Sequence, residues 1–300
     1  MSLNVTAIPA YTDQLSEVLI SKAVLDTNLM EFIDLKSGYS SGSVSLNIVD
    51  STLPVGAFAC GTDLGAGETV YTQVNVQIDD LQSRASSCIN DLRGIYQSAF
   101  LSPSMANDNM PFEEVLSAQY QEKLSKYNEG FLINGEATIA GSVGIKGQIT
   151  AAAGSGVPAA PVAWTVQNAV EQSLDIYDAI DPSVIDRDDL IMVVSNANYR
   201  TLVRALVAQN LYGFQSVEGN QILILPGTNI RVVASSGLLS SNYVFAGPGQ
   251  FITALTGLED EMSSFKFTYN SFDDLLYFRA AWRLGVGVAQ PELFATNGLA

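Results

Sequence analysis

The stretch from residue 111 to residue 147 decides the fold prediction, and it reads PFEEVLSAQYQEKLSKYNEGFLINGEATIAGSVGIKG. Its first half predicts an amphipathic helix over 111–129. Proline is favoured in a first helical turn, and Glu113 and Glu114 lie near the positive end of the helix dipole. The apolar residues recur at helical spacing: Phe112, Val115, Leu116, Tyr120, Leu124, Tyr127 and Phe131. Gly130 is expected to end the helix.

Two alternating segments precede that helix. Residues 43–50 and 70–78 place apolar side chains at every second position, which predicts strands with one apolar face. The glycine-rich and acidic residues between them predict a long hairpin with a loose tip. Because a two-stranded hairpin is only marginally stable alone, its apolar face must pack on a neighbouring subunit or, alternatively, on its own domain.

The hairpin therefore supplies most of the candidates for contact between subunits. To its apolar residues we add one tryptophan, for which core packing is the alternative. The candidates are Val44, Leu46, Ile48, Phe58, Cys60, Val74, Val76, Ile78 and Trp164.

The remaining segments predict a mixed α+β chain. Helices are expected at 12–36, 165–180 and 197–209, and a short helix with a turn at 79–102. A connector rich in small residues, proline and glycine covers 148–163. A buried strand is expected at 190–194, and the later strands at 222–225, 230–233, 243–246, 251–255, 265–269 and 275–288.

Charged residues are scarce, at 15% of 300 residues, against about 25% in soluble domains. This composition indicates either a surface that is largely buried against other chains or a β-rich domain with a polar, uncharged surface. The net charge is −17, and the 14 lysines and arginines form no run. We therefore expect no tight or sequence-specific nucleic-acid binding, since that needs a basic patch.

The search for catalytic groups finds little. The chain contains no histidine, which removes the commonest general base and every histidine metal site. The acidic residues between Asp175 and Asp189 lack the spacing of a calcium loop and are interpreted as a solvated turn. We predict no enzyme, no cofactor and no metal site. Cys60 and Cys88 are expected to be free thiols, with an inter-subunit disulfide through Cys60 as the alternative.

The sequence also lacks targeting signals. Residues 1–10 carry neither a basic segment nor a long apolar run, so we expect no signal peptide. No stretch approaches about 20 apolar residues, so we expect no membrane span.

Taken in order, these segments resemble the HK97-type major capsid proteins of tailed bacteriophages. The hairpin at 43–78 and the helix at 111–129 resemble two characteristic parts of that family. FLING at 131–135 with GIKG at 144–147 resembles the exit from the family's long helix. Three later motifs resemble its strands: DLIMVVSN at 189–196, VFAG at 244–247 and LYFRAAWRLGVGVAQP at 276–291.

The resemblance implies an α+β, HK97-like capsid fold with five parts. These are an N-terminal arm (1–40), the extended hairpin called the E-loop (41–80), a peripheral P domain with its spine helix (81–150), an axial A domain (151–262) and strands returning to the P domain (263–300). It implies a structural virion protein that forms pentamers and hexamers of an icosahedral head, assembled in the host bacterial cytoplasm around double-stranded DNA. Implied partners are further copies of the chain and, as separate proteins, a scaffold, a portal and a decoration protein.

Two alternatives stay open. One is an encapsulin-type compartment shell that holds protein cargo, and the other is a secreted β-rich adhesin or binding module. Some capsid proteins of the family crosslink covalently through a lysine in the E-loop. Residues 41–82 contain no lysine, so that chemistry is not expected here.

Overall fold

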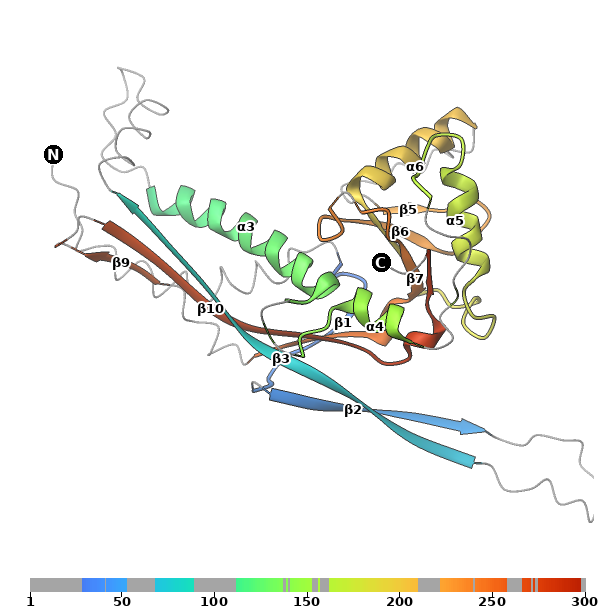
Figure 1. The fold of residues 1–300 in the computed structure, drawn as a ribbon, viewed down its shortest axis with the longest axis horizontal. Coiled ribbons are helices and arrows are strands. Elements are labelled where there is room, and N and C mark those ends of the chain that lie inside the picture. Colours follow the sequence, from blue (N-terminus) through green and yellow to red (C-terminus); the bar gives the residue numbers. More distant parts are fainter. Residues whose placement is uncertain are drawn as a thin grey trace, which may run out of the picture.

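The structure is a computed structural model, and it describes residues 29–40, 42–52, 68–88, 112–136, 139, 141–152, 156, 162–209, 222–239, 241–257, 266–270, 272 and 275–297. The described elements form two sheets with helices against them (Figure 1). The mixed α+β prediction is confirmed.

The first sheet is built around two long strands, β3 (Glu68–Cys88) and β10 (Leu275–Val288). They pair antiparallel, from Leu275 opposite Cys88 to Gly285 opposite Ile78. The strand order is β1-β8-β10-β3-β2, and β9 also pairs with β10. The bounds of the other strands are Asp34–Lys36 for β1, Gly42–Thr52 for β2, Ile252–Thr256 for β8 and Lys266–Asn270 for β9.

The long helix α3 (Phe112–Asn134) lies along β10 (Figure 1). The rings of Tyr120 and Phe278 stack with their centroids 4.3 Å apart. Deeper in the core, the indole Nε1 of Trp282 donates to Asn128 Oδ1 at 2.9 Å. Because a buried indole N–H and a buried amide satisfy each other here, the polar pair fixes how the helix sits on the strand.

The second sheet has the order β11-β7-β4-β6-β5. Every residue of β4 (Leu190–Ser195) is buried, since both faces of this sheet are covered. Helices α5 (Ala169–Asp178) and α6 (Asn196–Ala208) pack on the face that carries Met192 and Val194. The opposite face joins the core of α3, β10 and α4 (Ile145–Ala151). The remaining bounds are Ile222–Ile224 for β5, Arg231–Ser235 for β6, Phe245–Pro248 for β7 and Ala295–Thr296 for β11, with 3-10 turns η2 (Gly249–Phe251) and η4 (Pro291–Leu293).

Helix α3 extends past its predicted end. It continues through Gly130 and ends at Asn134, and Gly135 follows with φ +73°. The extra turn is stabilised by burial, because Leu132 and Ile133 are completely covered in the core. Gly135 is therefore the left-handed residue that closes the helix, and its amide donates to the carbonyl of Phe131 at 2.7 Å.

Three other predicted elements are corrected. The short helix predicted at 79–102 is wrong for residues 79–88, because β3 extends through them to Cys88. Residues 89–102 lie outside the described residues. The predicted E-loop boundary at residue 80 therefore falls inside a strand. Residues 34–36 form β1 instead of the end of a helix, and the start of that predicted helix is not described. Residues 148–151 belong to α4 instead of the connector.

Candidate subunit interface

The hairpin of β2 and β3 has one apolar and one polar face. The register places Val44 opposite Val76, Leu46 opposite Val74 and Ile48 opposite Thr72. Because side chains alternate along a strand, these pairs share one face. The opposite face carries uncharged polar residues, which are Ser43, Ser45, Asn47, Gln73, Asn75 and Gln77, all exposed. The Ser45 hydroxyl donates to Asn75 Oδ1 at 2.7 Å.

The apolar face is covered at its base and uncovered toward the tip. Ile78 and Val76 are each 1% exposed and pack with Leu255 of β8. Val74 is half-buried, and Val70, further out on the same face, is 48% exposed. Figure 1 shows the reason: β2 and β3 extend beyond the rest of the sheet. Apolar side chains are thus exposed to solvent where the hairpin projects beyond the other strands of the sheet.

The structure separates the predicted contact residues into three groups. Val44, Leu46, Ile48 and Val74 keep partial exposure on the projecting face. By contrast, Val76, Ile78 and Trp164 are buried inside this chain, and their contact with a neighbour stays a prediction. Phe58 and Cys60 lie outside the described residues.

Sequence reasoning missed two exposed residues on the hairpin. Val70 continues the apolar alternation, and Tyr71 on the other face is 75% exposed. The alternation itself could have identified Val70, because the period-two pattern runs through it. An exposed tyrosine on a projecting strand is a residue type that subunit interfaces favour.

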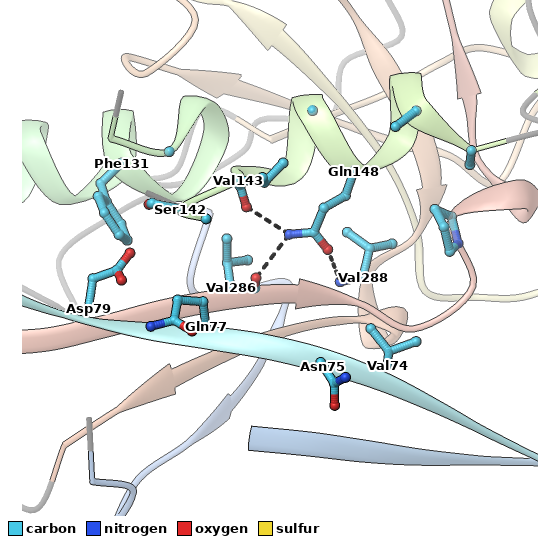
Figure 2. A pocket seen from close by; sticks show the side chains of 16 residues that line it. Val74, Asn75, Gln77, Asp79, Phe131, Ser142, Val143, Gln148, Val286 and Val288 are labelled. Atoms are coloured by element: carbon cyan, nitrogen blue, oxygen red, sulfur yellow. Dashed lines mark hydrogen bonds between the residues drawn. The ribbon is translucent and has the colours of Figure 1, made fainter. Parts of the chain in front are cut away.

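A cavity of about 460 Å³ lies at the base of the hairpin, between its polar face and helix α4 (Figure 2). Gln148 of α4 spans its inner wall and binds one backbone carbonyl that precedes α4 and one carbonyl and one amide of β10. Its Nε2 donates to the carbonyls of Val143 at 2.8 Å and Val286 at 3.0 Å, and its Oε1 accepts from the amide of Val288 at 2.8 Å. The cavity is therefore framed by hydrogen bonds between α4 and β10.

One carboxylate lines this cavity. Asp79 is 4% exposed, and its Oδ2 is buried without a hydrogen-bond partner. Figure 2 shows the side chain pointing from β3 toward Phe131. The neighbouring Asp80 lies on the other face of the strand, where it accepts from Arg283 Nε at 2.6 Å. A buried carboxylate oxygen without a partner is unfavourable, and Asp79 shares this feature with Glu129, whose Oε1 is likewise buried without a partner.

The described residues contain no cluster of three or more metal-ligating side chains. Within the same part of the chain, no helix is both long and apolar enough to cross a membrane. Cys88 is a free thiol, as predicted.

No protein-family model and no curated protein matches the sequence. Solved structures with a similar fold do match it. The virus-like particle from Pyrococcus furiosus contains a chain that is 11% identical, with a TM-score of 0.53 over 95% of this chain and 98% of that one. A chain of the native GTA particle capsid is 12% identical to this one, with a TM-score of 0.53 over 90% of this chain and 95% of that chain. A chain in the structure of Gordonia phage Cozz is 10% identical to this one, with a TM-score of 0.53 over 91% of this chain and 86% of that chain.

These similarities place the chain, along nearly its whole length, in the fold class of capsid and particle shell proteins. The resemblance to HK97-type major capsid proteins that the sequence motifs indicated is thereby confirmed at the level of the fold.

Proposed function

We propose that this chain is a structural shell subunit, a major capsid protein whose copies assemble into a closed icosahedral head around double-stranded DNA. The observation that carries the proposal is the shared fold, which spans 95% of this chain and 98% of the Pyrococcus furiosus particle chain. A fold shared with a particle shell chain over nearly the whole length supports the proposal that this chain has the same kind of role.

The projecting hairpin supplies one of these surfaces. Burial of apolar surface contributes about 25 cal/mol per Å², and Val70 with its half-buried neighbours offers such surface. A neighbouring copy that covers this face would complete the packing that the chain leaves unfinished. Each contact is small, but a closed lattice repeats it in every subunit, and multivalency then stabilises the whole.

The charge of the chain fits the enclosure of DNA without sequence-specific binding. With 31 acidic and 14 basic residues, the surface repels a polyanion. The DNA would be confined by the closed shell instead of by a basic patch. We place the subunits in pentamers and hexamers, with a scaffold, a portal and a decoration protein as further partners.

A second candidate is a compartment shell that holds protein cargo. The similarity to a virus-like particle favours it as much as it favours a phage head. The adhesin alternative gains nothing from a fold shared with shell proteins along the whole chain.

The contents of the assembled particle test the proposal. Particles are sedimented from cells that express the chain together with its neighbouring genes, treated with nuclease and then opened. Protected double-stranded DNA is the expected result. Protected protein without DNA would establish the compartment, and a failure to sediment any particle would contradict both shell functions.

A further inference from the structure

We propose that Leu239 is a contact residue for a second copy of this chain, and that it packs on the apolar face of that copy's β2–β3 hairpin. The inference rests on the proposed shell function and deepens it, because it names a surface that receives the hairpin. Leu239 lies in the turn that joins β6 to β7.

The backbone of Leu239 is strained. Its φ is +48°, and among the residues that the structure describes it is the only non-glycine with a positive φ. Leucine rarely adopts this left-handed conformation, because the Cβ comes too close to the following carbonyl oxygen. Strain of this kind persists where the surrounding structure imposes it, and it concentrates at functional positions. Leucine is therefore unfavourable here for folding, and glycine or asparagine would be the favoured residue.

The turn is held firmly against helix α3. The Ser236 hydroxyl donates to the Glu129 carboxylate, and Asn134 Nδ2 donates to the carbonyl of Gly237 at 2.8 Å. The amide of Leu239 then donates to the carbonyl of Ser236 at 3.1 Å. The turn thus presents Leu239 in one fixed position, and a preorganised contact loses little conformational entropy on binding.

The two leucines of the turn have opposite environments. Leu238 is 3% exposed and belongs to the core around α3, whereas Leu239 is 78% exposed. Among the described leucine, isoleucine and valine side chains, it is the most exposed. Single exposed leucines are common on protein surfaces, but this one combines exposure with a strained backbone and a fixed position. That combination points to a contact that the single chain does not make.

The charge distribution favours a second copy as the partner. Copies of a chain with a net charge of −17 repel one another, so they approach most readily through uncharged segments. Residues 232–258, which include the turn, contain no charged residue, and neither do residues 69–78 of β3. Each segment carries an apolar side chain that remains exposed, Leu239 in the first and Val70 in the second. The two surfaces are therefore matched in chemistry.

A contact between the turn and the hairpin joins two different surfaces of the same chain. Within one chain neither surface covers the other, because Leu239 and Val70 are both exposed. In an assembly each copy would offer its hairpin to one neighbour and its turn to another. Such a heterologous contact closes into a ring when its rotation allows, and the proposed pentamers and hexamers are rings. The neighbour then lies on the apolar face of the hairpin, as the proposed function requires.

The first test compares variants of Leu239 with a control on α6. Asparagine tolerates the left-handed conformation but is polar, so Leu239→Asn should leave the Tm of the unassembled subunit unchanged or higher. The same variant should raise the subunit concentration needed for particle formation, followed by light scattering, roughly tenfold or more, because an apolar contact is lost. Leu239→Met stays apolar, and Val207→Ser removes a different exposed apolar side chain, so both should assemble like the wild type. Normal assembly of Leu239→Asn, a lowered Tm of that variant, or an equal loss in Val207→Ser would overturn the proposal.

The second test identifies the partner surface without requiring closed shells. The photoreactive residue p-benzoylphenylalanine replaces Leu239, ¹⁵N-labelled and unlabelled copies are mixed and irradiated, and crosslinked peptides are identified by mass spectrometry. We expect mixed-label crosslinks to β2 or β3 of the hairpin, and none to the hairpin when the same residue replaces Val207. Crosslinks only within one copy, only outside the hairpin, or none would overturn the contact. If the wild type never forms particles, the proposed function fails, and this experiment still decides whether the contact exists.

Discussion

Two glycines near the end of α3 occupy opposite environments. Gly144 is buried against the turn that follows the helix, and a Cβ there would fall on the carbonyl of Ile133 and the amide of Gly135. These are backbone atoms, so they cannot rotate away. At Gly130, within the helix, a Cβ would meet nothing within 4 Å. The first glycine is required by close approach, whereas the second only weakens the helix.

Alanine substitutions should therefore have opposite effects. Gly144→Ala is expected to destabilise the unassembled subunit by about 1–3 kcal/mol through overpacking. Gly130→Ala should stabilise it by about 0.5–1 kcal/mol, because glycine is a poor helix residue. Urea unfolding followed by circular dichroism measures both. Equal effects of the two substitutions would contradict the packing described for this turn.

Burial of the Tyr243 hydroxyl makes the stability of the folded chain depend on pH in the alkaline range. Tyr243 is 5% exposed, and its burial raises the pKa of its hydroxyl to about 12, compared with about 10 in an unfolded chain. Folding thus favours the neutral tyrosine. This contribution to stability is complete below pH 10 and is lost as the pH rises through about 12, at about 1.4 kcal/mol for each pKa unit of difference.

We expect Tyr243→Phe to flatten the alkaline part of the stability profile. Between pH 10 and pH 12 the wild-type urea midpoint should fall more steeply than that of the variant, which has no hydroxyl to ionise. Tyr71→Phe is the control, because Tyr71 is 75% exposed, and it should follow the wild type. Parallel profiles for all three proteins would show that burial of Tyr243 does not set this pH dependence.

At the scale of elements, the hairpin of β2 and β3 has an apolar face that the described part of its own chain covers only at the base. Ile48 and Val70 lie on its apolar face, while Asn47 and Gln73 lie opposite in the same strands. Full burial of a valine or isoleucine is worth about 1.5–3 kcal/mol. If a neighbour covers the apolar face, this free energy belongs to assembly and only slightly to the folding of one chain.

The double variant Ile48→Ser/Val70→Ser should assemble poorly. We expect the subunit concentration needed for particle formation to rise at least tenfold, because about 1.4 kcal/mol per subunit corresponds to one factor of ten. The Tm of the unassembled subunit should change little. Asn47→Ser/Gln73→Ser controls for changes in the strands, and light scattering follows assembly of both. Similar assembly of the two variants would remove the apolar face from the interface.

The sequence patterns predicted elements whose residues carry their own signal. The apolar run of β4, the helical spacing of α6 and the alternation of the hairpin all appear in the structure close to the expected bounds. They could be predicted because burial of one face, or of both, leaves a local period.

Elements that depend on distant partners could not be predicted in this way. Strand β3 continues to Cys88 because Leu275 and the residues after it, nearly two hundred positions later, pair with it. The last turn of α3 persists past Gly130 because remote core residues cover Leu132 and Ile133. Asp79 looked like any acidic residue at a strand end, and only the folded chain shows that it is buried beside a cavity.

At the scale of the whole molecule, the chain combines a well-packed body with an extended hairpin that its own body does not cover (Figure 1). The body has a shared core between its two sheets. The acidic charge disfavours random association between copies, and under the proposed function the apolar hairpin face would favour one arrangement. This combination is the one expected of a subunit that must stay separate until it joins a lattice.

The most direct test is negative-stain electron microscopy of the purified protein, combined with size-exclusion chromatography and light scattering over a series of protein and NaCl concentrations. The account predicts closed shells, capsomer-like rings or tubes with the mass of many copies, favoured by salt because screening weakens the repulsion between acidic subunits. A monomer under every concentration, salt and crowding condition, also when the neighbouring genes are co-expressed, would contradict the claim that this chain builds a shell.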